Sequence, residues 1–420
     1  MKTIFQRARV AGSTVQFTPA ANCLRHSCSL PTGEAGTGTD PPSAGDGREP
    51  SRESDFSPPP VEERASRPLH GTAGFPALSR RPSQVLVLAA SGSQSSTLGA
   101  QALANAAGKF EVRLVTRRPA AFVRNATVRC GDLHMDIAQH PRATVADHTD
   151  GLDPDDLLVL DATAVPGLDS TIALTPPGSR VLYTQNGVPT HEAQTRQRGL
   201  EVHRGASMIT SSRRPPQGGV TVAPGGRLLV DQNSSIVDIL AEVLRNRGFF
   251  ELVAVPDIRA TQFEKIALNC ALNVVATLSG RTLGELLQLT HQDARAENLI
   301  GGLAAEVCAI AVAQGIRIKP TDQVIGDIQR AMACFPQHPT SMRMAFEAGH
   351  ASEIDVLNGA ISRLGRECGI ATPLNDLVTE KLRMYHDVRE ADGVGDGFHQ
   401  RHRPLVALVL EELLLAARRA

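Results

Sequence analysis

Apolar residues in the first half of the chain occur in short continuous runs, separated by small and polar residues. The segment Gln84–Ala90 is almost entirely apolar, and Glu111–Thr116 follows it after an alanine-rich, helix-forming stretch. Unbroken runs of this length are typical of strands buried on both faces of a parallel sheet. Residues 157–160 and 181–184 predict two further strands. The order strand, turn, helix, strand indicates the opening βαβ unit of a Rossmann-type dinucleotide-binding domain.

The pattern changes near residue 257, where apolar positions begin to recur at helical spacing and few strand-like runs remain. Just before this change, Val220–Val230 places Pro224-Gly225-Gly226 between two apolar runs, which predicts a hairpin. The expected fold is therefore α/β followed by all-α. A Rossmann-type domain should occupy residues 81–256, and a helical domain that carries substrate and catalytic residues should occupy 257–420.

The first 80 residues lack both patterns. Residues 1–33 contain basic residues but no acidic one, since the first acid is Glu34. This composition is that of an organelle import peptide, with the mitochondrion as the expected destination. A tail without function, in a cytoplasmic protein, is the alternative. Residues 34–80 are rich in glycine, proline and serine with clustered charges, which predicts a disordered linker.

Composition narrows the expected partners. The formal net charge of -1 over 420 residues offers no basic field to attract nucleic acid, so no such partner is expected. No run of 18 apolar residues occurs, so no membrane span is expected. The 7 cysteines are scattered and the 13 histidines show no metal-binding spacing, which favours reduced thiols and no metal site.

Three of the candidate cofactor-binding positions lie near the start of the first domain. The turn expected at Ser91–Gly99 offers only Gly92 and Gly99 for a close backbone approach to phosphate, with serines between them. Both a working cofactor loop and a Rossmann scaffold with reduced or lost cofactor binding fit this turn. Arg117 ends the second strand, where arginine suits the 2′-phosphate of NADP, although it could also be a solvated charge.

Asn186 and Gly187 follow the strand at 181–184. An Asn-Gly pair is often merely a turn. At the carboxyl end of a parallel strand, however, it faces the crevice in which ligands bind in open α/β sheets.

A polar stripe marks the first helix of the second domain. Lys265, Asn269 and Asn273 are spaced four residues apart, so they lie on one helical face, each about 6 Å beyond the one before it. Buried lysine and asparagine need partners, because an unpaired polar group inside a protein is destabilising. The stripe could face water or another domain. Its narrowness within an apolar helix favours a ligand cleft.

Together these segments resemble ketopantoate (2-dehydropantoate) reductases. The stripe is similar to the start of that family's helical domain, and further similar segments follow it: Gly284–Leu286, Thr340–Met342, Glu353–Gly359 and Gly369–Asn375. Arg117 and Asn186-Gly187 occur in the expected order. The resemblance covers roughly residues 84 to 390 and is stronger in the helical half.

The resemblance implies an NADPH-dependent reduction of 2-dehydropantoate, a small 2-oxoacid, to (R)-pantoate for pantothenate and coenzyme A synthesis. Lys265 would protonate the alkoxide and Glu353 would keep this lysine charged and oriented. The other roles implied are substrate binding by Asn269, Asn273 and Ser341, and NADP(H) binding by Gly92, Gly99, Arg117 and Asn186. The alternatives are a helix cap for Ser341 and a capping or solvated pair for Glu353 and Asp355. The long helix expected at 292–314 could form a homodimer surface.

Some positions depart from the family pattern. The glycine fingerprint is broken between Ser91 and Gly99, Asp161–Ala164 replaces an expected lysine, and Ala345 stands where an aspartate is usual. The first two changes affect the cofactor rather than the substrate chemistry. They favour a second hypothesis, in which the chain is a catalytically weak or silent relative that acts as an organelle binding or assembly factor.

Overall fold

The computed structural model describes two short amino-terminal pieces and most of the chain from residue 84 onward. The described residues are 9–10, 13–14, 84–89, 93–105, 110–116, 126–147, 156–160, 172, 175–189, 191–213, 219–244, 248–337, 339–392 and 397–418. In the predicted import peptide only β1 (Arg9–Val10) and β2 (Ser13–Thr14) are described, and they pair antiparallel. The predicted linker at 34–80 lies outside the described residues.

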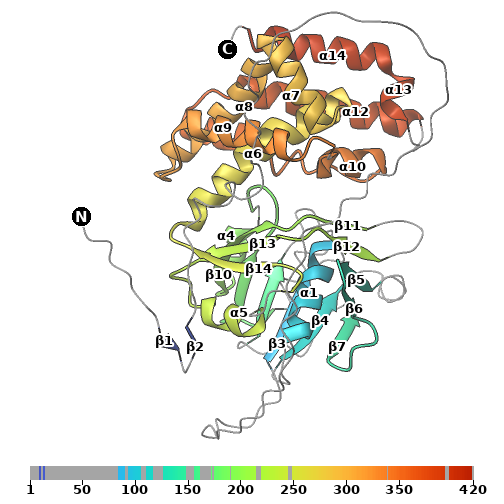
Figure 1. Cartoon of the computed structure of the whole chain (residues 1–420). Coiled ribbons are helices and arrows are strands. Elements are labelled where there is room, and N and C mark those ends of the chain that lie inside the picture. Colours follow the sequence, from blue (N-terminus) through green and yellow to red (C-terminus); the bar gives the residue numbers. More distant parts are fainter. Residues whose placement is uncertain are drawn as a thin grey trace, which may run out of the picture. The chain divides into compact units, whose positions relative to one another are not determined.

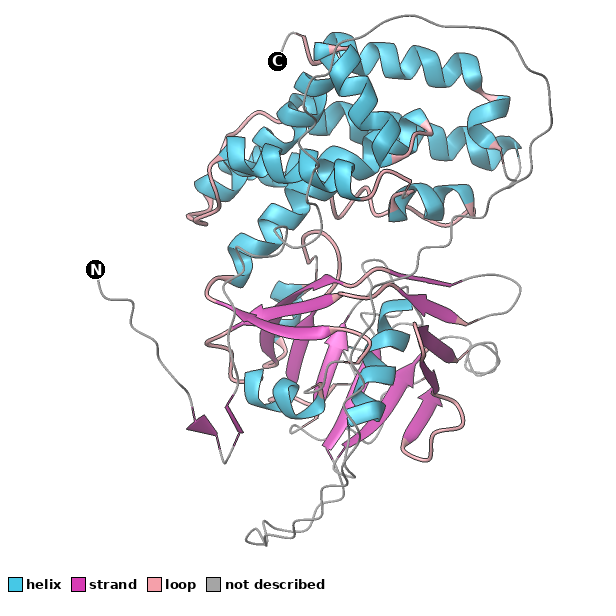
Figure 2. Ribbon diagram, viewed as in Figure 1, coloured by secondary structure: helices cyan, strands magenta, loops and turns pink. Residues whose placement is uncertain are grey.

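The first domain is built on an eight-stranded sheet (Figures 1 and 2). Its order is β14-β13-β10-β9-β8-β3-β4-β7, and β10–β13 is the one antiparallel pair. The bounds are β3 (Gln84–Ala89), β4 (Phe110–Val115), β7 (Ala143–Ala146), β8 (Leu157–Leu160), β9 (Arg180–Tyr183), β10 (Glu201–Met208), β13 (Arg227–Asp231) and β14 (Glu251–Val255). The four predicted strands are confirmed to within a residue at their ends. The apolar run of β9 is buried as expected, since Val181, Leu182 and Tyr183 are fully buried.

A smaller sheet has the order β11-β12-β5-β6. Its strands are β5 (Thr127–Cys130), β6 (Leu133–Asp136), β11 (Ser211–Arg213) and β12 (Val220–Val222). The hairpin predicted around Pro224–Gly226 is wrong, because β12 pairs with β11 whereas β13 pairs with β10. The chain instead crosses between the two sheets at 223–226, beside Thr210, whose carbonyl accepts a hydrogen bond from Ala223 at 2.9 Å. Local turn signals could not distinguish such a crossing from a hairpin.

The helices among the described residues of the first domain are α1 (Ser93–Asn105), α4 (Glu192–Gln197) and α5 (Val237–Val243). Helix α1 begins at Ser93, so the predicted loop Ser91–Gly99 is wrong in extent and Gly99 lies inside the helix. One turn into α1, the Thr97 hydroxyl donates to the Ser93 carbonyl at 2.8 Å. Serine and threonine favour helix starts because their hydroxyls hydrogen-bond to nearby backbone groups. The same serines that replace the expected glycines therefore belong to the helix.

The second domain consists of helices, and no strand occurs among the described residues from 257 to 418. The helices are α6 (Ile258–Ser279), α7 (Leu283–Gln292), α8 (Ala294–Ala313), α9 (Thr321–Cys334), α10 (Ser341–Glu347), α11 (Asn358–Cys368), α12 (Pro373–Asp392), α13 (Phe398–Arg401) and α14 (Arg403–Ala416). Helix α6 begins after Asp257, whose carboxylate accepts a hydrogen bond from the Ala260 amide at 3.0 Å. It ends at Gly280, which takes the left-handed conformation with φ 66°. Between these caps, α6 is long enough to contact both β10 and the other helices.

A buried polar network joins the central helices. The Glu306 carboxylate of α8 accepts hydrogen bonds from the backbone amides of Leu374 and Asn375, both at 2.9 Å, at the start of α12. The Asn358 amide donates to the Asn375 side chain at 2.9 Å and to the Cys270 carbonyl of α6 at 3.0 Å. Desolvation raises the pKa of Glu306. A carboxylate at the N-terminus of a helix stabilises that helix. Because Glu306 binds the start of α12 in this way, the segment Gly369–Asn375 has a structural role.

Helix α8 alone among the described helices has the length and apolar composition of a membrane span. Half of that stretch is buried inside the protein, with Leu303, Ala304 and Val307 fully buried in the helical core. A helix in the core of a folded domain can also have this length and apolar composition. Five cysteines are described and all are free thiols, three of them buried, and burial raises the pKa of Cys130 and Cys308.

Candidate active site

Lys265 lies where the first domain meets α6. Its ammonium donates a hydrogen bond to the side-chain oxygen of Asn186 at 2.7 Å and another to the Ser207 carbonyl at 2.5 Å. The Asn186 side-chain nitrogen donates in turn to the two carboxylate oxygens of Glu353, at 3.4 and 3.2 Å. Three residues widely separated in sequence thus form one chain of contacts. Asn186 is its centre, as its amide binds a cation on one side and a carboxylate on the other.

The setting of Lys265 changes its protonation. Burial lowers the pKa of its ammonium from the ordinary 10.5 to about 8, and the nearby Glu353 carboxylate opposes this shift. Desolvation outweighs the attraction because Glu353 acts across Asn186 and accepts its hydrogen bonds from the amide. A lysine with a pKa near 8 is charged at neutral pH and also releases its proton readily, which is what a general acid requires.

The loop after β9 packs directly against the turn that carries Glu353. Gly187 has φ 76°, and a Cβ atom placed on it would lie 2.2 Å from the Val356 carbonyl oxygen. The next residue, Val188, donates its backbone amide to the same carbonyl at 2.8 Å. Glycine is therefore needed at 187 for both its conformation and its size. This close approach brings Glu353 within reach of Asn186.

Asn269 and Asn273 continue the stripe along α6. They are 8% and 5% exposed, and within the described part of the chain neither side-chain amide has a hydrogen-bond partner. Their polar atoms are not among those fully enclosed without a partner, so they keep contact with solvent. Two nearly buried amides with free donors and acceptors, one and two helical turns from Lys265, are suited to bind a polar ligand.

Ser341 is not brought into contact with Lys265, Asn269 or Asn273 by any hydrogen bond among the described residues. It is exposed at the first position of α10, a helix that packs against α6. The cap of α10 is Thr340, whose hydroxyl accepts a hydrogen bond from the Arg343 amide at 3.4 Å, so Ser341 is not the helix cap.

Glu353 and Asp355 have different surroundings in the structure. Asp355 is exposed and forms an ion pair with Arg383 at 2.5 Å, so the solvated-pair interpretation holds for this residue. Glu353 instead accepts the hydrogen bonds of Asn186. Only one of the two acids lies at the candidate site.

The cofactor candidates are less fully described. Gly92 and Arg117 lie outside the described residues. Gly99 is buried within α1, six residues after its start, so its backbone cannot form the tight turn that was predicted for it. The start of α1 is fixed instead through Ser93, whose hydroxyl donates to the Ser211 carbonyl at 3.2 Å. Asn186 is the one cofactor candidate that the structure places beside Lys265.

Sequence reasoning missed two partners of the site, the Ser207 and Val356 carbonyls. Backbone carbonyls are present at every position, so no side-chain signal could have revealed them. Within the described residues, no group of three histidine, cysteine, aspartate or glutamate side chains is arranged to hold a metal ion.

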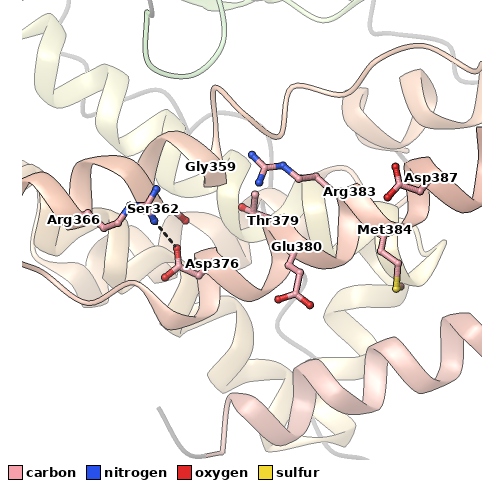
Figure 3. A pocket seen from close by; sticks show the side chains of 9 residues that line it. All are labelled: Gly359, Ser362, Arg366, Asp376, Thr379, Glu380, Arg383, Met384 and Asp387. Atoms are coloured by element: carbon pink, nitrogen blue, oxygen red, sulfur yellow. Dashed lines mark ion pairs between the residues drawn. The ribbon is translucent and has the colours of Figure 1, made fainter.

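A surface groove of about 380 Å³ lies elsewhere, between α11 and α12 (Figure 3). It is lined by Gly359, Ser362, Arg366, Asp376, Thr379, Glu380, Arg383, Met384 and Asp387. Its arginines are already paired, Arg366 with Asp376 at 3.7 Å and Arg383 with Asp355. The groove contains none of the predicted site residues, so we place the candidate active site at Lys265.

Comparison with known proteins gives matches in both domains. Residues 257–386 match the family model for the ketopantoate reductase PanE/ApbA C terminal. The 2-dehydropantoate 2-reductase of Pyrobaculum aerophilum is 30% identical over 143 residues, which are 34% of this chain and 48% of that protein. The enzyme of the same name from Salmonella typhimurium is 26% identical over 239 residues, which are 55% of this chain and 73% of that protein. The chain spans about half the length of the first of these relatives.

Solved structures share the fold over a larger part of the chain. A PanE/ApbA family ketopantoate reductase from Ralstonia eutropha JMP134 has a TM-score of 0.61 at 22% identity, covering 72% of this chain and 99% of that one. D-mandelate dehydrogenase in complex with NADH has a TM-score of 0.59 at 20% identity, covering 73% and 99%. The shared architecture is a Rossmann-type domain followed by a helical domain. The family model matches the helical domain that holds Lys265, and the curated relatives and solved structures agree with it, so all three comparisons indicate the ketopantoate reductase family.

Proposed function

We propose that this protein reduces 2-dehydropantoate to (R)-pantoate with NADPH, and that Lys265 is the general acid. The observation that carries the proposal is the contact chain Lys265–Asn186–Glu353. It places an ammonium at the carboxyl end of parallel strand β9, the edge at which open α/β sheets bind their ligands. Relatives named 2-dehydropantoate 2-reductase support the choice of substrate.

Reduction of the ketone requires a cation beside the ketone oxygen. Bound NADPH would supply the hydride. As the ketone carbon accepts it, negative charge builds up on the oxygen, and the Lys265 ammonium stabilises that charge and then donates its proton to it. Lys265 is left neutral, a state that its lowered pKa of about 8 makes accessible. Glu353 favours the return of the proton because its carboxylate raises the pKa of the lysine.

Substrate binding is assigned to the stripe beyond Lys265. The Asn269 and Asn273 amides, which lack protein partners in the described part of the chain, would hold the hydroxyl and carboxylate of 2-dehydropantoate by hydrogen bonds. Ser341 is proposed as a further contact on the basis of the sequence, and its place on a helix packed against α6 supports this. Asn186 would position the nicotinamide end of the cofactor. Mitochondrial import and a homodimer stay predictions.

Arg117 is expected to decide the choice of cofactor. Replacing it with alanine should weaken NADPH binding roughly ten-fold or more, because a charge-assisted contact to the 2′-phosphate is worth about 1.5–3 kcal/mol. Binding of NADH should hardly change, as NADH lacks that phosphate. A fluorescence titration of both cofactors against the wild-type protein and Arg117→Ala measures this.

Two results of the same titration would count against an NADPH enzyme. If NADPH and NADH bind equally well to the wild-type protein, the role of Arg117 is wrong. If neither cofactor binds at millimolar concentration, the reductase proposal fails and the silent binding or assembly factor is left as the better hypothesis.

The rate of ketone reduction is expected to depend on pH through Lys265. Below about pH 8 the ammonium is charged and kcat/KM should be flat; above it the general acid is lost, and kcat/KM should fall about ten-fold per pH unit. Glu353→Gln removes the carboxylate that raises the pKa of Lys265, so the midpoint should move below that of the wild-type protein. A midpoint that stays in place in this variant, or moves upward, would refute the electrostatic role of Glu353.

A further inference from the structure

Strand β10 has one edge that is only partly covered by strands. Its pairing with β9 runs from Glu201 to Arg204, whereas its pairing with β13 on the other side runs from Gly205 to Met208. The last four residues of β10 therefore have no strand partner on the β9 side among the described residues. Carbonyl groups two residues apart on a strand point to the same side, so Gly205 and Ser207 offer two acceptors in a row.

Side chains of α6 take up these two acceptors. The Gln262 amide donates to the Gly205 carbonyl at 2.9 Å, and the Lys265 ammonium donates to the Ser207 carbonyl at 2.5 Å. Residues three apart lie on one face of a helix, which matches the two-residue spacing along the strand. Gln262 is 7% exposed, so its hydrogen bond is shielded from water. Helix α6 thus occupies the place that a continuation of β9 would take.

We propose that Gln262 is a positioning residue for Lys265. By binding the Gly205 carbonyl it fixes the register of α6 against β10, and this register holds the Lys265 ammonium between Ser207 and Asn186. The inference rests on the proposed role of Lys265. Gln262 is not one of the three residues of the polar stripe, and it has no role in the proposed reaction. Gln262 touches neither substrate nor cofactor in this scheme.

The surroundings make the arrangement sensitive to loss of this one bond. The lysine side chain is a flexible four-carbon stem, so its end is located only by the backbone that carries it and by its contacts. Glu353 is the charged group that acts on Lys265. The neighbouring acid on α6, Glu264, is paired with Lys319 at 2.8 Å and does not compete. Without Gln262, the Gly205 carbonyl would lose its buried donor and the start of α6 could shift.

The test compares Gln262→Met with Asp257→Ala. Methionine keeps the length of the side chain but cannot donate to Gly205. Alanine at 257 removes the cap of α6, which also loosens its first turn but leaves both β10 carbonyls bound. In Gln262→Met, kcat should fall about ten-fold or more with KM nearly unchanged, since a displaced general acid slows the chemical step. Asp257→Ala should lose stability and keep kcat within about two-fold.

An NMR titration of the isotope-labelled lysine side chain in the unliganded protein gives a second readout that needs no turnover. The Lys265 midpoint should rise by about one unit in Gln262→Met, as the ammonium gains water, and stay in place in Asp257→Ala. Equal midpoints in Gln262→Met and the wild-type protein would overturn the proposal, as would equal shifts in the two variants. This outcome can be told apart from failure of the proposed reaction, which would show as no NADPH-dependent turnover in the wild type. Should Gln262→Met not fold, Gln262→Asn shortens the amide and predicts the same shift.

Discussion

Replacing Lys265 with methionine is expected to lower kcat by a factor of roughly 10² to 10⁴, the usual loss when a general acid is removed. Methionine fills nearly the same space but has neither charge nor proton, so binding of the substrate through Asn269 and Asn273 should largely survive. KM should therefore change much less than kcat. Steady-state oxidation of NADPH in the presence of 2-dehydropantoate, followed by absorbance, measures both constants.

Lys319 provides the matched control. It also lies in the helical domain, but its ion pairs are with Glu264 at 2.8 Å and Asp327 at 2.9 Å, residues outside the contact chain Lys265–Asn186–Glu353. Lys319→Met removes the same charge and should keep kcat within about two-fold, because partly exposed ion pairs contribute at most about 1 kcal/mol. If Lys265→Met and Lys319→Met have the same small effect, Lys265 is not the general acid.

Replacing Gly187 with alanine is the second change with a large expected effect. The left-handed φ of 76° disfavours any side chain by about 1–2 kcal/mol, and the new Cβ atom would lie 2.2 Å from the Val356 carbonyl oxygen. Relieving that overlap requires backbone movement, at about 1–3 kcal/mol more. The free energy of unfolding should thus fall by about 2–5 kcal/mol. Activity should fall too, since the loop and the Glu353 turn must separate.

Gly225 isolates the effect of the overlap. It has nearly the same φ of 79°, but a Cβ atom placed there would meet nothing within 4 Å. Gly225→Ala should therefore lower stability by only the conformational share, about 1–2 kcal/mol, and leave kcat unchanged. Urea unfolding of both variants gives the difference. Equal losses of stability in the two variants would mean that the loop after β9 does not pack on the Glu353 turn as described.

Much of the fold could be predicted from the sequence, because burial leaves a clear pattern. Strand β9 and its neighbours lie on continuous apolar runs, and α6 shows helical spacing with a cap at each end. The stripe on α6 was predicted from the placement of polar residues within an apolar helix. In the structure, Lys265 of that stripe contacts Asn186. This agrees with the predicted position of Asn186 at the carboxyl end of β9.

What could not be predicted depends on tertiary pairing and on the backbone. The Pro224–Gly226 segment carries the signals of a hairpin, but whether flanking strands pair is decided by distant partners such as β10. Glycine positions do not mark the start of α1, because the helix begins at Ser93. The acceptors at Gly205 and Ser207 are main-chain atoms, so the importance of Gln262 has no signature in the sequence.

A crystal structure of the protein with NADP⁺ and pantoate tests the central claim most directly. The Lys265 ammonium should lie within about 3 Å of the pantoate oxygen that derives from the ketone, with the Asn269 and Asn273 amides bound to the rest of the molecule. The carbon that bears this oxygen should face the nicotinamide, next to Asn186. Pantoate bound away from α6, or a Lys265 ammonium that makes no contact with it, would contradict the assignment of the active site.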